Sequence, residues 1–285
     1  QSSGAQAAAT WTGALARLAE HVRPVLQTDA SAFRVLVSAH ASHEELFLVR
    51  ELVRQTQGPG ALPRVEVSWT TSDKSQPARA TFRVPAVDAP NVAGARAFGF
   101  NVPLGESARA DLSALRGAVE SGAVKALFVL DPGPDGSIGD VSWIVDARTT
   151  GTLAHLIVQC TVRTALASVA DVVLPGAAWT EKNATYANDG GRLQATSRVM
   201  NPPGEAREDW QVLTQVAETL GVACRYTDSV AVRAAIAEAM DGVPGMAGIA
   251  QVMVAKPHAA RAWRQTSNPS ERWKWDHVFR DLPPV

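Results

Sequence analysis

Two kinds of hydrophobic pattern alternate along the first third of the chain. Residues 11–26 place an apolar side chain about every 3.6 positions, which predicts an amphipathic helix lying on a sheet. Residues 33–39 form a short apolar run typical of a strand, and Ser-x-x-Glu at 42–45 is a capping box that starts a helix. Gly-Pro-Gly at 58–60 ends that helix, and 65–69 resumes the strand pattern. One strand–helix–strand unit is therefore complete.

The same alternation continues to about residue 220. Residues 107–121 have helical spacing and lead into 124–130, whose almost unbroken apolar run predicts a strand inside a parallel sheet. Residues 70–87 are interpreted as a loop, and 91–99 as a short helix with Asn91 as its cap. The remaining predictions are a helix at 139–149 ending at Gly151, strands at 156–159 and 171–174, and helices at 164–169, 204–221 and 229–240.

This order of elements predicts an α/β fold, namely a doubly wound, mostly parallel sheet with flanking helices. We expect a linker at residues 1–10, where a longer protein was cut, because this stretch is polar and lacks the pattern of a secretion signal. Residues 11–225 are predicted to form the α/β part, and 226–285 a helical and irregular C-terminal extension. The Trp- and Arg-rich tail 262–285 fits no pattern that we can interpret.

Charge and composition exclude several classes of function. The formal net charge of −1 comes from 27 basic and 28 acidic residues without long blocks, which argues against nucleic-acid binding. No apolar run is long enough to insert into a membrane directly. The two cysteines, Cys160 and Cys224, lie far apart, so this segment cannot supply the clustered ligands of a zinc or iron–sulfur site. Two free thiols suit a reducing cytoplasm.

Few residues suggest chemistry of their own. His40 and His43 are three apart, but they lie at a strand-to-helix turn, so we favour surface or core histidines over a metal pair. The chain has no phosphate-binding loop, no dinucleotide fingerprint and no hydrolase nucleophile elbow. Several carboxylates are interpreted as helix caps or surface groups: Glu44, Glu45, Glu181, Glu208 and Asp209.

The loop Asp-Pro-Gly-Pro-Asp-Gly at 131–136 follows the carboxyl end of a predicted buried strand. Ligands of open α/β sheets bind at this edge, so the position predicts a site by geometry alone. The alternative is a rigid turn made by proline and glycine, and the sequence favours this simpler interpretation.

Three ordered blocks resemble a known family. They are the run ADVVLP at 170–175, the run from Glu181 to Gln194, and the segment 202–210 with PPG and REDW. Together they resemble the molybdopterin-oxidoreductase superfamily, with greatest similarity to the large iron–sulfur (G) subunit of bacterial NADH:quinone oxidoreductase, or complex I. Weaker similarity covers 9–20, 125–132 and 226–240.

The resemblance implies an oxidoreductase subunit whose chemistry lies outside this segment. It implies no catalytic residue, metal or cofactor here, with iron–sulfur clusters in an N-terminal portion that the chain does not contain. Asp131, Thr164, Asn188 and Arg192 match positions near the pterin crevice of active members, and they are candidates for a vestigial site. The implied role is a scaffold bound to other complex I subunits, at the cytoplasmic face of the inner membrane and peripheral through those partners.

Two alternatives remain open. The chain could be the C-terminal part of a catalytic molybdopterin enzyme such as a formate dehydrogenase, or a stand-alone binding module of the same fold. A catalytic member ordinarily continues into a second, β-barrel domain that embraces the pterin. The residues after Gly221 begin with a helix and offer few strands, which favours the scaffold.

Overall fold

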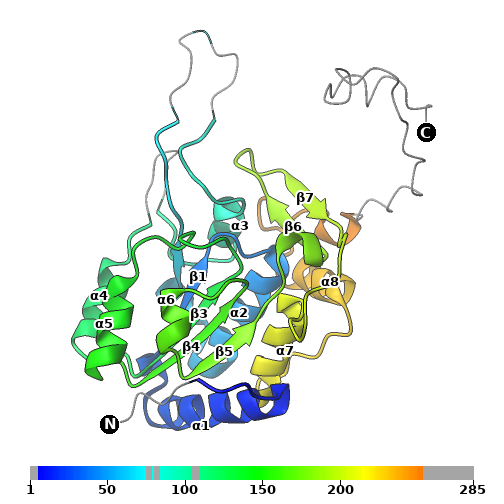
Figure 1. Cartoon of the computed structure of the whole chain (residues 1–285). Coiled ribbons are helices and arrows are strands. Elements are labelled where there is room, and N and C mark those ends of the chain that lie inside the picture. Colours follow the sequence, from blue (N-terminus) through cyan, green and yellow to red (C-terminus); the bar gives the residue numbers. More distant parts are fainter. Residues whose placement is uncertain (1–5, 75–78, 80–83, 104–109, 253–285) are drawn as a thin grey trace, which may run out of the picture. The chain divides into compact units, whose positions relative to one another are not determined.

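A computed structural model describes residues 6–74, 79, 84–103 and 110–252. The chain divides into compact units at 1–254 and 255–285, and the described residues belong to the first. Their centre is a five-stranded parallel sheet in the order β2-β1-β3-β4-β5 (Figure 1). The strands are β1 (Phe33–Ser38), β2 (Glu66–Ser68), β3 (Ala126–Asp131), β4 (His155–Cys160) and β5 (Val172–Pro175).

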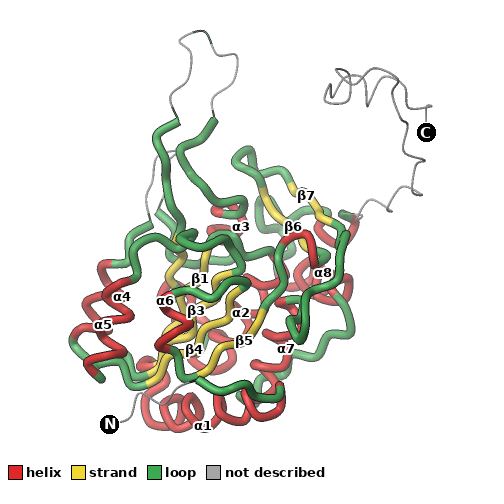
Figure 2. The backbone as a smooth tube through the Cα atoms, viewed as in Figure 1, coloured by secondary structure: helices red, strands yellow, loops and turns green. Residues whose placement is uncertain are grey.

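Helices cover both faces of this sheet (Figure 2). One layer contains α1 (Trp11–Asp29), α2 (His43–Gln57), α7 (Asp209–Thr219) and α8 (Ser229–Ala239). The other contains α4 (Ser113–Glu120), α5 (Ser142–Thr150) and α6 (Ala165–Val169). The shorter elements are α3 (Val92–Ala97), η1 (Ala30–Ala32), η2 (Pro59–Arg64), η3 (Trp179–Glu181) and η4 (Ile249–Gln251). The predicted doubly wound α/β fold is confirmed.

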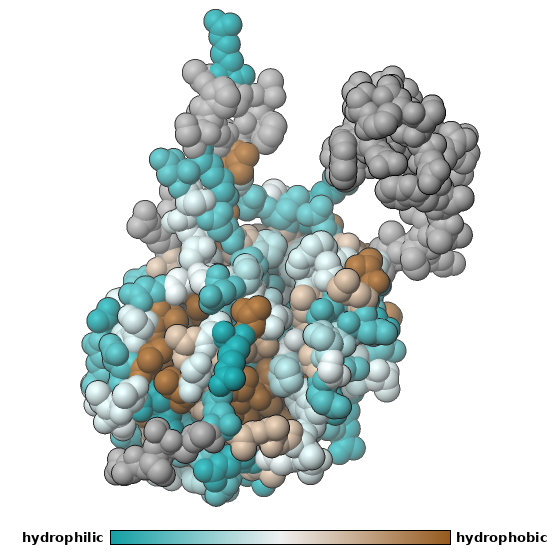
Figure 3. Space-filling view, viewed as in Figure 1, coloured by the Kyte–Doolittle hydropathy of each residue, from teal (hydrophilic) through white to brown (hydrophobic). Residues whose placement is uncertain are grey.

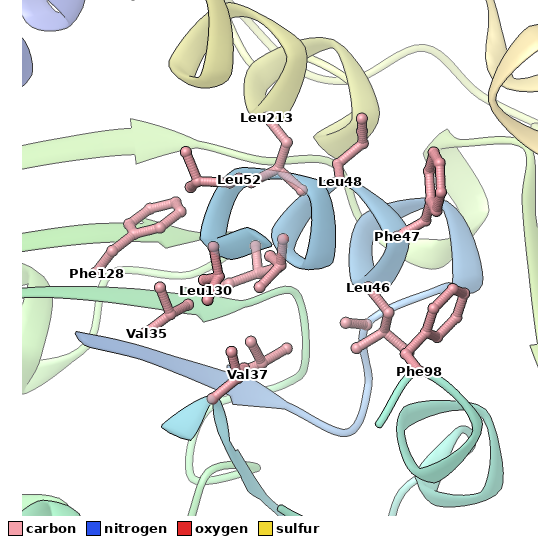
Figure 4. Close-up of a cluster of buried hydrophobic side chains, with 14 of the residues drawn as sticks. Val35, Val37, Leu46, Phe47, Leu48, Leu52, Phe98, Phe128, Leu130 and Leu213 are labelled. Carbon is pink, nitrogen blue, oxygen red and sulfur yellow. The ribbon is translucent and has the colours of Figure 1, made fainter. Parts of the chain in front are cut away.

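The core follows from the alternation of side chains along each strand. Val35 and Val37 of β1 face the layer of α2, whereas Leu36 between them faces the layer of α4 and α5. Figure 4 shows α2 between these strands and Leu213 of α7. Both faces of the sheet are apolar because helices cover both of them. This explains why the segment 124–130 is an almost unbroken hydrophobic run in the sequence.

The predicted helix ends are confirmed where the signal was local. At the start of α2, the Glu45 NH donates to Ser42 Oγ at 3.4 Å, and the Ser42 NH donates to Glu45 Oε2 at 3.2 Å. Gly58 ends the helix with a φ of 86°, and Gly151 ends α5 in the left-handed region. These helix ends could be predicted from the sequence because each depends on residues only a few positions apart.

Three predicted helix starts were too early. α5 begins at Ser142 rather than 139, since Gly139 has a φ of 78° and the Ser142 NH donates to Asp140. α7 begins at Asp209 rather than 204, because the Arg207 NH donates to the Pro175 carbonyl and holds the chain against the end of β5. α4 begins at Ser113, although residues 104–109 of the longer prediction lie outside the described residues.

An antiparallel hairpin was missed. β6 (Ala184–Ala187) pairs with β7 (Leu193–Thr196), where the predicted order of elements contains no strand. The turn between them is held by its own residues: Asn188 Oδ1 accepts from the NH groups of Gly190 and Arg192, and Gly191 has a φ of 71°. Four-residue strands of mixed polarity leave too little alternation to be recognised.

The region beyond residue 225 begins in the same core. Val232 and Ile236 of α8 are fully buried among the side chains that cover the sheet. The predicted boundary at 225 remains a prediction, and the tail 253–285 lies outside the described residues. Hydrophobic residues on the face in Figure 3 are interspersed with hydrophilic ones. Among the described helices, none has the length and apolar character required to cross a bilayer.

Asn91 joins the sheet to the hairpin instead of capping α3. It occupies the predicted N-cap position, but its side chain makes no capping hydrogen bond. The Nδ2 atom donates to the Ala41 carbonyl at 2.8 Å, and Oδ1 accepts from the Ala187 NH at 2.8 Å. The predicted capping role is therefore wrong, because two buried backbone groups compete for this amide.

We expect Asn91→Ala to lower the free energy of unfolding by about 1–3 kcal/mol, because it leaves the Ala41 carbonyl and the Ala187 NH unpaired in the interior. Urea unfolding of the purified protein measures this change. Asn201→Ala, at an exposed position, is the control and should change stability by less than about 0.5 kcal/mol. Equal effects of the two substitutions would contradict the bridging role.

Candidate functional site

The crevice between the carboxyl ends of β1 and β3 is the position where this fold would bind a ligand. From β1 the chain runs into α2 on one face, and from β3 it runs into α5 on the other, so the two connections diverge here. Ligands of open α/β sheets bind at such a switch point. The loops at residues 39–42 and 131–137 border it.

These two loops contact each other across the crevice. A Cβ added at Gly133 would lie 2.3 Å from Ser137 Oγ and 2.9 Å from the His40 ring, so only glycine fits between them. Ser38 Oγ and Ser137 Oγ are 3.4 Å apart, and His40 Nε2 lies 3.0 Å from the Asp88 carbonyl. The loops therefore pack directly on each other at the switch point.

Asp131 serves the loop that it begins. Its buried Oδ1 accepts from Ser137 Oγ at 2.7 Å and from the Gly133 NH at 3.3 Å. Burial raises the pKa of Asp131, and the hydrogen bond from Ser137 opposes that shift. Thr161 Oγ1 donates to the Gly133 carbonyl at 3.0 Å and ties the loop to the end of β4. The contacts of Asp131 match the rigid-turn interpretation of residues 131–136.

The other crevice candidates also bond within their own loops. Thr164 is the N-cap of α6, where its Oγ1 accepts from the Ala167 NH at 3.3 Å. Asn188 accepts from the backbone of its hairpin turn, and Arg192 is exposed in that same turn. The structure thus places Asn188 beside Arg192, while no hydrogen bond between described residues joins this turn to Asp131 or Thr164. A vestigial role for the four residues stays a prediction.

Sequence reasoning missed two buried ionic clusters at neighbouring residues of α2, namely Lys182 with Glu45 and Asp209, and Arg233 with Glu44. We call the two clusters together the buried ionic network. Lys182 Nζ lies 2.6 Å from Glu45 Oε1 and 2.7 Å from Asp209 Oδ2, and all three side chains are almost completely buried. Glu45 belongs to the first turn of α2, and Asp209 is the first residue of α7. Both helix starts favour negative charge, and Lys182 places one positive charge between the two carboxylates.

The second half of the network joins α2 to α8 and to the hairpin. Arg233 Nη1 donates to Glu44 Oε1 at 3.0 Å. The other oxygen, Oε2, accepts from the NH of Thr185 at 2.9 Å and from its hydroxyl at 3.1 Å. Thr185 Oγ1 also lies 3.2 Å from His43 Nδ1, so β6 supplies a partner for one ring nitrogen of the predicted core histidine, while its buried Nε2 has no partner among the described residues.

The capping interpretation is confirmed for Glu45, whereas the interpretation of Glu44 and Asp209 as caps or surface groups is wrong. Glu45 does close the capping box, but all three carboxylates are buried and bound to distant cations. No local pattern could reveal this, because Lys182 is 137 residues from Glu45 and Arg233 is 189 residues from Glu44. The local interpretation holds for Glu181, which accepts from the Ala178 NH.

Burial controls the protonation of the network. Burial raises the pKa of Glu44 and that of Glu45, the latter to about 7, although the cations oppose both shifts. Burial alone would lower the pKa of Lys182, but Asp209 and Glu45 outweigh it and raise that pKa well above its ordinary value. Three carboxylates face two cations, so the network favours one additional proton. It suits a structural connection better than proton transfer with solvent.

The remaining titratable groups offer little chemistry. Burial raises the pKa of the Cys160 thiol and that of Cys224 to about 11, so both remain protonated and unreactive near neutral pH. Burial lowers the pKa of His43 to about 3, which keeps its ring neutral. The described part of the chain brings together no three His, Cys, Asp or Glu side chains suited to a metal ion.

Comparison with known proteins finds similarity over the central region. A family described as Molybdopterin oxidoreductase matches residues 89–219. The chain is 50% identical over 72 residues to the mitochondrial NADH-ubiquinone oxidoreductase 78 kDa subunit of Candida albicans, and 51% over 67 residues to that of Neurospora crassa. It is 40% identical over 108 residues to the F420-dependent formate dehydrogenase subunit alpha of Methanocaldococcus jannaschii.

Each of these similarities covers only part of this chain and only part of the relative. The aligned residues are 25%, 24% and 38% of this chain, respectively, and the chain spans 10%, 9% and 16% of those three relatives. Among solved structures, acetylene hydratase from Pelobacter acetylenicus superposes on 40% of this chain and 16% of its own, with 22% identity and a TM-score of 0.33. That superposition is too limited to support a conclusion.

We expect Lys182→Met to lower the free energy of unfolding by about 3–5 kcal/mol, because Glu45 and Asp209 lose their shared cation while remaining buried. Adding Glu45→Gln and Asp209→Asn should restore much of that loss. Urea unfolding at pH 7 compares these variants with Lys125→Met, an exposed control. A loss below about 1 kcal/mol in Lys182→Met would contradict the role of the network.

The raised pKa of Glu45 predicts a pH dependence. Since its pKa moves from 4.5 to about 7, the folded state holds an extra proton between these values, and stability falls as pH rises through this window. The loss amounts to at most about 3 kcal/mol. Urea unfolding at pH 5 and pH 8 should show a smaller difference in Glu45→Gln than in the native protein. The exposed control Glu120→Gln should keep the native difference, and an unchanged difference in Glu45→Gln would refute this assignment.

Proposed function

From the match of residues 89–219 to the Molybdopterin oxidoreductase family, we propose that the chain is a cofactor-free scaffold and docking part of the iron–sulfur subunit of an NADH:quinone oxidoreductase. In this role it supports electron transfer from NADH to quinone without carrying electrons itself. The iron–sulfur clusters are proposed to lie in another portion of the same protein. Other subunits of the complex are its proposed partners, and they hold it peripherally at the cytoplasmic face of the inner membrane.

The observation that carries this proposal is the close contact between the two loops at the crevice. A pterin dinucleotide is a large anionic ligand that needs open space and converging NH donors or cations. At the switch point, Gly133 packs against Ser137 and His40, and Pro132 and Pro134 have no NH to donate. The Asp131 carboxylate also repels phosphate groups. These residues do not fit such a ligand, which supports a body that retains the fold for packing.

The buried ionic network supports the same role. It joins the ends of α2, α7 and α8 to the hairpin through charge-assisted hydrogen bonds. Its groups are almost completely buried, so none is available to a substrate. Similarity to the 78 kDa subunits of NADH-ubiquinone oxidoreductases supplies the assignment to this complex.

A second candidate is the corresponding part of a catalytic molybdopterin enzyme such as a formate dehydrogenase. The observation that favours it is the length of the match, since 108 residues align with the formate dehydrogenase subunit alpha and 72 with the 78 kDa subunit of Candida albicans. In that case the pterin would be held chiefly by other parts of the protein, with this segment behind them.

Metal and pterin analysis of the native complex separates the two candidates. We expect the complex purified through the full-length protein to contain iron and acid-labile sulfide, NADH:quinone reductase activity and the other subunits of that enzyme. We expect molybdenum and tungsten far below one atom per complex, and no fluorescent product of oxidised pterin. Near-stoichiometric molybdenum or tungsten, with formate-dependent reduction of an acceptor, would instead establish the second candidate.

A further inference from the structure

The two outer edges of the β6–β7 hairpin differ in what covers them. On the outer edge of β6, the Thr185 NH donates to Glu44 Oε2 and the Ala187 NH donates to Asn91 Oδ1. Side chains from α2 and from the start of α3 thus take the place of a neighbouring strand. This edge is closed to another chain.

The outer edge of β7 has no such cover among the described residues. The Asn188 NH donates to the Arg192 carbonyl, which makes this the first hydrogen-bonded pair of the ladder. Hydrogen-bonded and non-hydrogen-bonded pairs alternate in an antiparallel ladder. The backbone NH and C=O groups of Gln194 and Thr196 therefore point toward β6, and those of Leu193 and Ala195 point outward. No described residue bonds to these outward groups. Two donors and two acceptors are therefore available in one row.

Apolar side chains continue this edge. Trp179 is 66% exposed, Val199 is 74% exposed and Met200 is 55% exposed. They lie close together, because the NH groups of Val199 and Met200 donate to the carbonyl of Thr180, next to Trp179 in the sequence. We call these three side chains, with the outward backbone of β7, the β7 edge surface. Large apolar groups are rarely left exposed next to an open strand edge unless they bind something.

The charge of this segment indicates what it binds. Residues 192–200 contain Arg192 and Arg198 and no acidic residue. Arg198 pairs with Glu208 but remains 45% exposed, and Arg192 is exposed in the turn. The strand also lacks the lysine or proline by which many proteins block an edge. A segment that matches this surface is extended and carries both acidic and apolar side chains.

We propose that the β7 edge surface binds an extended segment of a partner polypeptide, rich in acidic and apolar residues, which adds a third strand to the hairpin. Backbone hydrogen bonds to Leu193 and Ala195 supply the register, and the apolar residues of the partner cover Trp179, Val199 and Met200. The inference rests on the proposed docking function and names the kind of segment that docks. Strand addition itself does not depend on which enzyme complex contains the protein.

Hydrogen exchange on the full-length protein provides the first test. The amides of Leu193 and Ala195 should exchange at least tenfold more slowly in the native complex than in the free, folded subunit. Slow exchange already in the free subunit would mean that another part of the same protein covers the edge, and equally fast exchange in both states would mean that nothing does. Protection that appears on self-association alone would identify a second copy. Each of these three results would overturn the proposal.

Substitutions in the full-length protein provide the second test. Ala195→Pro removes one outward donor, and Arg192→Glu reverses a charge, so each should reduce retention of the partner in the purified complex at least tenfold. The matched controls are Gln194→Ala, which keeps the inward backbone pairing, and Lys125→Glu, which reverses an exposed charge just before β3 in the other sheet. Circular dichroism and thermal melting establish that each variant folds. Normal retention in a folded Arg192→Glu variant would overturn the acidic character of the partner.

A photoreactive residue in place of Val199 then identifies the segment bound in the native complex. Cross-linking to an acidic, apolar stretch of another subunit supports the proposal, and cross-linking only within the same chain overturns it.

The proposed function and the proposed strand-addition site fail in different ways. Normal assembly of both edge variants with the NADH:quinone oxidoreductase subunits would remove the strand-addition site and leave the proposed function intact. Protection of the edge by a partner from a different enzyme would do the reverse.

Discussion

The position of Lys182 between Glu45 and Asp209 is the interaction on which the arrangement of this part of the chain depends. Isolated carboxylates at two buried helix starts would be costly, and a buried ammonium without partners would be equally so. Each of the three groups is therefore tolerated only if the other two are in place. This fixes α2 and α7 relative to the hairpin more specifically than apolar packing alone, which accepts many combinations of similar volume. The same three charged side chains thus connect α2, α7 and the segment that leads into β6.

Glycine and hydrogen-bonded loops complete this arrangement at the carboxyl edge of the sheet. Gly176, directly after β5, has no room for a Cβ because Asp209 Oδ1 would lie 2.3 Å away. Gly133 is restricted in the same way by Ser137 and His40. The edge that would hold a ligand in an open α/β fold is thus occupied by contacts between loops. Close backbone approach has replaced open space, and this gives a physical basis for the proposed scaffold role.

The sequence predicted the fold where its signals are local and periodic. The sheet strands, the capping box at Ser42 and the glycine ends of α2 and α5 depend on residues within a few positions of each other. Helix starts were misplaced where a glycine with positive φ interrupts helical spacing, as at Gly139 and Gly204. The ionic network was not predictable from one sequence, because a buried lysine has no local signature that separates it from an exposed one. The sequence indicated that Asp131 lies at the carboxyl end of a strand, but the contacts of the four crevice candidates could not be predicted from it.

The long separation within the network has a consequence for how the protein is made. Arg233 emerges from the ribosome 189 residues after Glu44, which at common rates of translation is a delay of roughly 10–40 s. Glu45 has no cation until Lys182 is synthesised, and Glu44 has none until Arg233 is synthesised, so burying either carboxylate earlier would be unfavourable. The nascent domain is therefore kept open and hydrated at this end until α8 is synthesised. The synthesis of α8, rather than early collapse, becomes the event that closes this part of the core.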